Sequence, residues 1–209
     1  MSDVGPFRRG TSPFDFTAGV PRPGRYPPDG LDVPEAIEAI RFAPVEVGYG
    51  FDAAGRQIFR QVGDADGISG FERRDLTALT NGTLVHSHPP YQEFPEGDPR
   101  RRAGSFSPLD LVFMYETELL EVIAVTRERT YFLRRRREGL FLDPGQIQAD
   151  YARYRRRVER QLMVMLARGI ISREEAEAQG RLADEIMDRF SDAFEYRWEE
   201  VRLDDDQPK

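Results

Sequence analysis

The chain contains no cysteine, two histidines and a single lysine, Lys209. The absence of cysteine excludes disulfide bonds and thiolate metal sites, so any metal must be bound through nitrogen and oxygen atoms. No apolar run reaches the length of a membrane span, and the N-terminal residues lack the apolar core of a signal peptide. The formal net charge of −7 argues against a general affinity for nucleic acid. We therefore expect a cytoplasmic protein that binds neither membranes nor nucleic acid.

Proline and glycine are concentrated near the N-terminus, and this divides the chain into three parts. Residues 1–31 contain few aliphatic side chains, and such a segment cannot bury enough surface to fold alone. It is either disordered or draped over the rest of the protein through its phenylalanines. Residues 32–140 show strand and helix patterns, interrupted by a Pro- and Arg-rich stretch at 89–106. Residues 141–209 are expected to form a C-terminal helical extension.

The periodicity of apolar residues in 32–140 predicts an α/β domain. Ser107 is a suitable N-cap, with Pro108 at the first helical position and Asp110 at the third. The predicted elements are helices over 32–43, 72–80 and 107–117, a hairpin of strands 45–51 and 56–62, a strand over 83–88, and a second hairpin over 120–136 that turns near residues 127–129.

The strand predicted over 45–51 has two unlike faces. Its odd-numbered residues, from Val45 to Phe51, are all apolar, whereas the other face carries only Glu46, Gly48 and Gly50. This pattern predicts an apolar back and a bare front that carries one carboxylate.

The region 144–200 is expected to be helical. Tyrosine, valine and leucine recur at helical spacing from Pro144 until Gly169, and a Ser–Glu capping box at residue 172 begins a second helix that we expect to reach residue 194. The apolar stripes, which include Met163, Met165 and Phe190, are expected to pack on the domain or on each other. A partner-binding or dimerisation face is the alternative.

Both histidines lie in the sequence LVHSHPPY, two positions apart. On an extended strand His86 and His88 project from the same face, about 7 Å apart along the backbone. Two imidazoles in this position can bind one metal ion. Zinc in catalytic sites takes three protein ligands and keeps one position for water, so a carboxylate is the expected third ligand.

Each of these patterns alone is also typical of ordinary structure, because histidines occur at strand ends and S-x-x-D begins many helices. Together they resemble the signature of the JAB1/MPN/Mov34 metalloenzyme family, also called JAMM: an upstream Glu46, then HSHP at 86–89, then SPLD at 107–110. The resemblance covers about residues 34–137 and is greatest to bacterial and phage-borne members. It implies a mixed sheet flanked by helices, related to the cytidine-deaminase fold.

The resemblance also implies a role for each motif residue. His86, His88 and Asp110 would bind Zn²⁺, and a water would complete the site. Glu46 would act as general base and return the proton to the leaving amine. Ser107 would hydrogen-bond the developing oxyanion. Its competing role as helix N-cap would have to be met by the same hydroxyl.

Family resemblance alone suggests the substrate, which would be a protein with a flexible tail such as a ubiquitin-like modifier. The tail could pair along the strand that carries Gly48 and Gly50, or along the edge of the 57–62 strand. Two alternatives remain open from the sequence: a peptidase or toxin module of a mobile element with an unrelated substrate, and a metal-free scaffold that binds partners through its C-terminal helices.

The sequence differs from the family pattern in one spacing. The separation between His88 and Asp110 is about twice the usual one, so 89–106 is predicted to be an inserted loop at the rim of the site. Tyr91, Phe94 and the arginines 100–102 could bind a partner, or the loop could be flexible and solvated. Glu93 and Glu96 in this loop are poor ligand candidates, because a mobile segment cannot hold a carboxylate in place.

Overall fold

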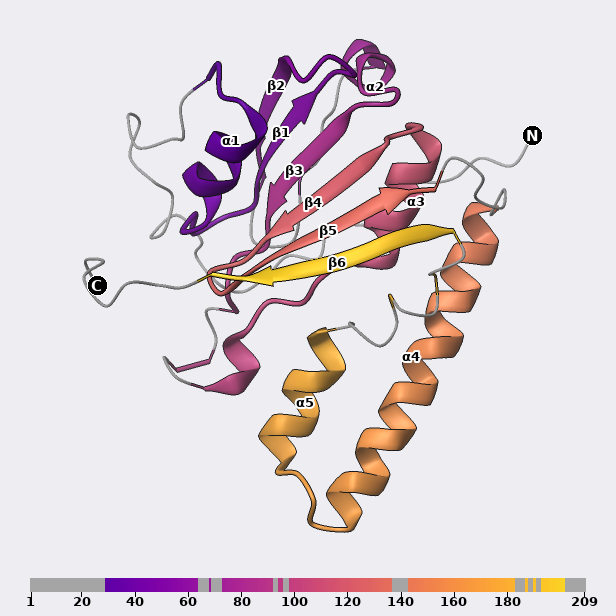
Figure 1. The fold of residues 1–209 in the computed structure, drawn as a ribbon. Coiled ribbons are helices and arrows are strands. Elements are labelled where there is room, and N and C mark those ends of the chain that lie inside the picture. Colours follow the sequence, from indigo (N-terminus) through magenta and orange to yellow (C-terminus); the bar gives the residue numbers. More distant parts are fainter. Residues whose placement is uncertain are drawn as a thin grey trace, which may run out of the picture.

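The computed structural model describes residues 29–63, 68, 73–91, 94–95, 98–136, 143–182, 187, 190 and 193–201. It shows a six-stranded mixed sheet flanked by helices (Figure 1), which confirms the predicted α/β class at this level. In chain order the elements are α1 Val33–Ile40, β1 Val47–Phe51, β2 Gln57–Val62, α2 Arg73–Ala78, β3 Thr83–Ser87, η2 Pro99–Arg101, α3 Pro108–Glu116, β4 Glu121–Val125, β5 Arg129–Arg135, α4 Pro144–Ala167, α5 Arg173–Leu182 and β6 Phe194–Glu200.

The strand order is β2-β1-β3-β4-β5-β6, and only β3 and β4 at its centre pair in parallel. Parallel neighbours need a crossover connection, and here the chain crosses through η2 and α3. As a result, the N-terminus of α3 follows the C-terminal end of β3. This topology brings the HSHP and SPLD segments to the same end of the sheet.

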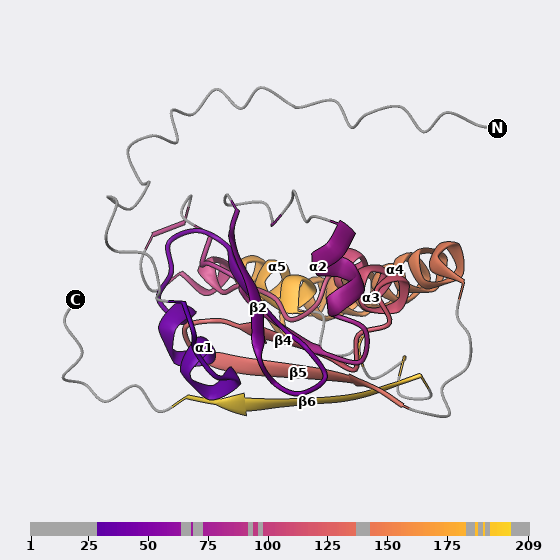
Figure 2. The same cartoon turned by 90° about the horizontal axis from the view of Figure 1, so that it is seen from above.

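The two faces of the sheet are covered by different helices. α1 lies on one face, while α2, α3, α4 and α5 lie on the other (Figure 2). The predicted apolar back of β1 is confirmed, because Val47, Tyr49 and Phe51 form a buried cluster with Ile40 of α1 and its neighbours. The strand itself begins at Val47, so Glu46 immediately precedes it.

The larger apolar cluster lies on the α3 side of the sheet. It joins strand residues such as Val122 and Leu133 to Leu111 and Met114 of α3, and to Ile147 of α4. α4 therefore shares the core of the sheet rather than standing apart from it. Among the described helices, none combines the length and apolar character that a membrane span requires.

The prediction that a helix reaches residue 194 is wrong at its end. The prediction that residues 141–209 form a purely helical extension is also wrong. The described part of α5 ends at Leu182, and Phe194–Glu200 forms β6, which pairs antiparallel with all of β5. The physical reason is the alternation of Phe194, Tyr196 and Trp198 with charged residues, which suits a strand beside a free sheet edge. The predicted packing of Met163 is also wrong, because this side chain is 62 % exposed, whereas Phe190 is buried.

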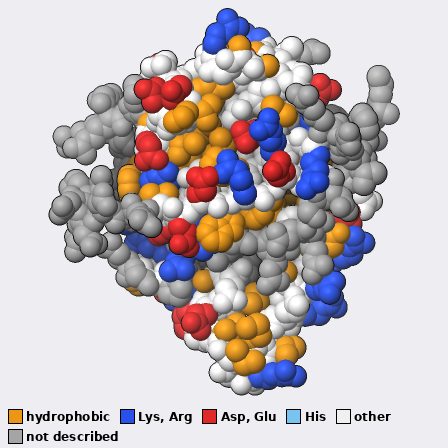
Figure 3. All heavy atoms as spheres, viewed as in Figure 1, with side chains coloured by type: hydrophobic (Ala, Val, Ile, Leu, Met, Phe, Trp, Pro, Cys, Tyr) orange, Lys and Arg blue, Asp and Glu red, His pale blue; other side chains and the backbone are white. Residues whose placement is uncertain are grey.

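Beyond α1, the same sheet face is covered by charged side chains. Acidic and basic groups alternate over this surface (Figure 3), and the guanidinium of Arg197 lies 3.7 Å from the centre of the Phe132 ring. Arg197 and Phe132 are paired across β6 and β5. An arginine stacked on an aromatic ring shields its apolar surface while its charge stays in water, so this part of the sheet needs no covering helix.

Most predictions for residues 1–31 lie outside the described residues. The last three are described, and they are attached to the sheet. The backbone amides of Gly30 and Leu31 donate to the side-chain oxygen of Gln57 on β2, at 2.8 and 3.0 Å.

Candidate metal centre

The two histidines meet at the end of β3. His86 lies in the strand and is 1 % exposed, and His88 follows it, with its backbone amide bonded to the carbonyl of Val125 on β4. Their Nε2 atoms are 2.8 Å apart. The expectation that both imidazoles project from one face is met, and the rings are in direct contact.

The tautomer of His88 follows from its second contact. Its Nδ1 lies 2.9 Å from the carbonyl oxygen of Gly104. A carbonyl oxygen can only accept, so Nδ1 must carry the proton and Nε2 keeps its lone pair. This is the arrangement in which a backbone carbonyl orients a metal-binding histidine. Gly104 therefore prepares His88 to act as a ligand.

His86 is held in its neutral form. Its pKa is lowered from 6.5 to about 4, mainly by burial and to a smaller extent by neighbouring His88, while Asp110 acts in the opposite direction. A neutral imidazole is the form that binds metals. Its Nδ1 is a buried polar atom for which the described part of the chain provides no hydrogen-bond partner.

Glu46 completes a group of three possible ligands. One of its carboxylate oxygens and one ring nitrogen from each histidine all lie within 4.8 Å of one another. The antiparallel register explains this, because Gly48 pairs with His86 and two further residues along each strand bring Glu46 opposite His88. The carboxylate predicted for the bare front of the strand therefore faces both imidazoles.

Asp110 approaches the same place from α3. Its Oδ1 lies 3.4 Å from Nε2 of His86, while its Oδ2 accepts the backbone N–H of Ser107 at 2.6 Å. Ser107 Oγ in turn accepts the N–H of Asp110 at 3.3 Å, which forms the predicted capping box. One carboxylate oxygen of Asp110 thus caps the start of the helix, and the other is directed at His86.

Glu46, His86 and His88 form a group that could hold a divalent metal ion, whereas Asp110, the predicted third ligand, lies outside this group and close only to His86. Two ligand atoms that share a tetrahedral zinc ion at 2.0–2.1 Å are about 3.4 Å apart, which is the separation of Asp110 Oδ1 and His86 Nε2. The two Nε2 atoms are closer, at 2.8 Å, which is the distance of a hydrogen bond in which the Nε2–H of His86 donates to Nε2 of His88. Nitrogen and oxygen donors suit zinc and several other divalent metals. The group His86, His88 and Glu46 is thus a possible metal site, with Asp110 beside it.

The glycine front of β1 is not bare, contrary to the prediction. A Cβ atom added to Gly48 would lie 2.5 Å from Cδ1 of Ile68, and one added to Gly50 would lie 2.2 Å from the ring of Phe59. Glycine is needed here because two apolar side chains approach the backbone closely. A substrate tail therefore does not have free access along this strand.

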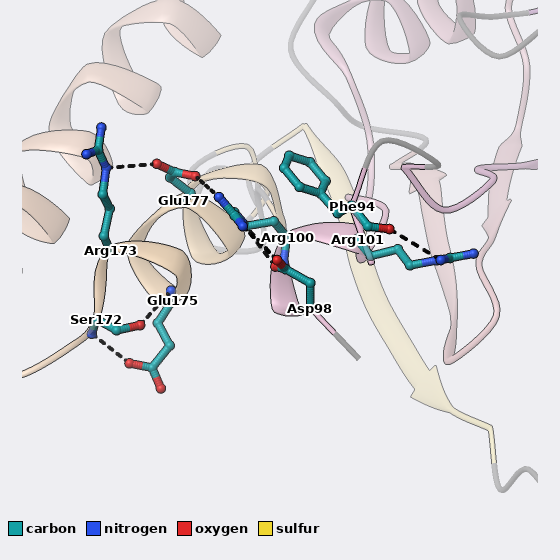
Figure 4. A network of polar contacts seen from close by, with 8 residues as sticks. All are labelled: Phe94, Asp98, Arg100, Arg101, Ser172, Arg173, Glu175 and Glu177. Atoms are coloured by element: carbon teal, nitrogen blue, oxygen red, sulfur yellow. Dashed lines mark hydrogen bonds and ion pairs between the residues drawn. The ribbon is translucent and has the colours of Figure 1, made fainter. Parts of the chain in front are cut away.

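The predicted inserted loop is attached to the C-terminal helices. Arg100 of η2 forms a bidentate pair with Asp98, in which Nε donates to Oδ1 and Nη2 to Oδ2, and its Nη1 lies 3.5 Å from Oε2 of Glu177 on α5 (Figure 4). Its guanidinium also stacks over Phe94 at 4.7 Å, and Arg101 donates to the backbone carbonyl of Phe94. Arg100 is thus engaged within the protein. Glu93 and Glu96 lie outside the described residues.

Two contacts of the site were missed at the level of sequence. One is the carbonyl of Gly104, for which a sequence carries no signal because every residue has such a group. The other is Tyr151 of α4, whose buried hydroxyl donates to the carbonyl of Phe106 at 3.0 Å, directly before Ser107. Its helical spacing predicted burial, but the partner depends on how α4 packs.

The chain matches no protein-family model, no curated protein and no solved structure. The resemblance to the JAB1/MPN/Mov34 family therefore rests on the motif residues and their arrangement alone.

Proposed function

We propose that this protein is a zinc-dependent hydrolase of the JAB1/MPN/Mov34 type that cleaves a peptide or isopeptide bond. The observation that carries the proposal is the convergence of Glu46, His86 and His88 within 4.8 Å, with Asp110 3.4 Å from His86. Carboxylates and imidazoles that are partly or fully buried together lose hydration, and a bound cation offsets that loss. The group is thus better explained as a metal centre than as packing.

In this proposal the ligands are His86, His88 and Asp110. The first two offer Nε2, and Asp110 offers the Oδ1 atom that its capping box leaves available. A bound zinc ion would supply a Lewis acid and bring the pKa of a water near 7. Glu46 is then the general base, since its carboxylate faces the ligands from a separate strand. It accepts the proton of the attacking water and passes it to the leaving amine.

Ser107 can serve both the helix and the substrate. Its oxygen accepts the N–H of Asp110 through a lone pair, so the hydroxyl hydrogen remains to be donated. Directed at a substrate carbonyl, this O–H stabilises the oxyanion as negative charge develops. The two roles that compete in the sequence therefore use different parts of one hydroxyl group.

For the substrate we propose a protein with an extended C-terminal tail, such as a ubiquitin-like modifier. Because Ile68 and Phe59 cover the glycines of β1, the tail would enter from the side of α3 and the inserted loop. Leu109, which directly precedes Asp110, is 68 % exposed there, and Tyr91 is also exposed. These two side chains offer apolar contacts to a tail beside the metal ligands.

The proposal is tested by metal analysis and by Glu46→Gln. Protein purified without chelators should hold one zinc ion per chain and should release a fluorogenic amide from the C-terminus of a ubiquitin-like protein. Glu46→Gln should retain the metal and the fold but lose at least about 100-fold in kcat. The control is Glu116→Gln, an exposed change at the far end of α3.

Absence of stoichiometric zinc, or full activity of the Glu46→Gln variant, would contradict this function. Stoichiometric zinc without hydrolysis of the ubiquitin-like conjugate, combined with cleavage of other peptides, would favour the unrelated-substrate alternative. A metal-free protein would favour the scaffold.

A further inference from the structure

Ser87 lies between the two histidines and makes contacts of another kind. Its side chain is 1 % exposed, and its Oγ accepts the backbone N–H of Val47 at 2.9 Å. The same hydroxyl donates to the carbonyl of Val45 at 3.2 Å. Val45 and Val47 are the two neighbours of Glu46, so one hydroxyl holds the backbone on both sides of the proposed base.

This hydroxyl acts where the pairing of β1 and β3 stops. The last paired residues are Gly48 and His86, and beyond them the backbone of His88 bonds to Val125 on the opposite neighbour, β4. Beyond this pair, the backbone around Glu46 has no further ladder bonds to β3. Ser87 replaces the missing bonds, and the N–H of Gly63 holds the Glu46 carbonyl from the other side at 2.8 Å.

We propose that Ser87 is a positioning residue that holds the Glu46 carboxylate at its working distance from the two imidazoles. This inference rests on the proposed function, in which Glu46 is the general base. Ser87 points to the sheet face opposite the histidines because side chains alternate along a strand. It therefore acts on Glu46 through the backbone and has no contact with metal or substrate.

The test is the pair Ser87→Ala and Ser87→Thr, assayed with the zinc-loaded full chain and the fluorogenic conjugate. Ser87→Ala removes both bonds and should lower kcat at least about tenfold, because misplacement of a catalytic group by an ångström can cost about 100-fold. Its KM and zinc content should be unchanged, since His86, His88 and Asp110 are untouched. Ser87→Thr keeps the hydroxyl and should restore kcat. Ser87→Cys, close to serine in size and a weak hydrogen-bonding group, serves if the alanine variant does not fold.

The matched control is Thr126→Val. Thr126 is also buried, and its hydroxyl also bridges one backbone N–H and one backbone carbonyl, both of Arg129 at the start of β5. This variant should lose a similar amount of stability without the loss of kcat. Equal kcat values for Ser87→Ala and Thr126→Val, with wild type active and Glu46→Gln inactive, would overturn the inference.

Amide hydrogen exchange separates this inference from the proposed function. The N–H of Val47 should exchange about tenfold faster in Ser87→Ala than in wild type, because a buried hydrogen bond is lost. If the wild type hydrolyses nothing, the proposed function fails. In that case, unchanged exchange at Val47 would also overturn the role of Ser87, whereas faster exchange would show that Ser87 holds this segment.

Discussion

The parallel centre of the sheet has two antiparallel pairings on each side, and the β1–β3 pairing on one side is less complete than the β5–β6 pairing on the other. β1 and β3 pair over four residues and then separate at Glu46 and His88. β5 and β6 pair over seven residues, and side chains close both faces of the pair. Arg129 lies over Trp198 at 4.2 Å on one face, and Arg197 lies over Phe132 on the other.

The difference shows that regular backbone pairing is interrupted beside the candidate metal centre and complete at the β6 edge of the sheet. At the β1–β3 side, the pairing stops where side chains from two strand ends and one helix start converge. At the β5–β6 side, complete pairing and core burial stabilise the fold. We expect substitutions on the first side to affect metal binding and catalysis, and substitutions on the second to affect mainly stability.

The largest effect is expected for Asp110→Asn on the site side. The amide oxygen of asparagine can still accept the N–H of Ser107, so the helix should begin as before. The proposed metal centre would lose an anionic ligand, and its affinity for zinc should fall more than about 100-fold, since even residues behind the ligands contribute about 10–100-fold. Competition with a chromogenic chelator measures this. Unchanged zinc affinity would remove Asp110 from the ligand set.

On the β5–β6 side of the sheet, Leu133→Ala should lower the free energy of unfolding by about 2–5 kcal/mol. Leu133 is fully buried in the larger apolar cluster, so its truncation leaves a cavity. Urea denaturation measures the loss, and zinc content per folded chain should not change. The matched control is Leu109→Ala, an exposed leucine, which should cost less than about 0.5 kcal/mol. A similar cost for both would contradict the assignment of stability to this side.

Acid should destabilise the metal-free protein through His86. The unfolded chain takes up this proton near pH 6.5, whereas the folded protein does so only near pH 4, because burial lowers the pKa. Protons therefore favour the unfolded state as the pH falls through this window. The loss in unfolding free energy should reach about 3 kcal/mol. Denaturation curves at pH 7 and pH 4 should show a smaller loss for His86→Gln, and equal losses would contradict this origin.

A smaller effect on stability is expected where Tyr151 of α4 contacts the residue that precedes Ser107. Tyr151→Phe removes the hydroxyl that donates to Phe106 and leaves a buried carbonyl without it, at a cost of about 1–3 kcal/mol. Burial raises the pKa of Tyr151 to about 12, so the group is protonated and able to donate at neutral pH. The control Tyr154→Phe removes a hydroxyl that accepts from the exposed Arg153 and should cost much less. Thermal unfolding of both variants measures the difference.

Much of the fold could be predicted because its signals are local. Alternation in 45–51 identified the buried face of β1, and Ser107, Pro108 and Asp110 identified the start of α3. These two segments and the strand predicted over 83–88 supplied four ligand-type residues, because the two carboxylates and two imidazoles lie at strand and helix ends that the topology brings together. The fold predictions needed only the two periods of regular structure and one capping rule, whereas the choice of Glu46, Asp110 and Ser107 as site residues came from the resemblance to the JAB1/MPN/Mov34 family.

The remaining features depend on distant parts of the chain. The sequence predicts helix through the region of β6 because the charged residues of 172–190 favour helix. The free edge of β5, with which β6 pairs, is not visible in the sequence. The contact of Ile68 with Gly48 could not be predicted. A glycine indicates only that some group approaches the backbone closely, and it does not indicate which group that is. The hydroxyls of Ser87 and Tyr151 bond to backbone atoms, and a backbone partner leaves no residue-specific trace.

The bond from His88 to the carbonyl of Gly104 has a consequence for redesign. The loop between the second histidine and α3 ends with the one atom that fixes the proton on that ring, so the loop cannot be exchanged as a whole. A graft that replaces residues 89–102 keeps this anchor and would change only the chain around the proposed metal centre. A graft that extends through Gly104 would release the imidazole to rotate and to change its tautomer.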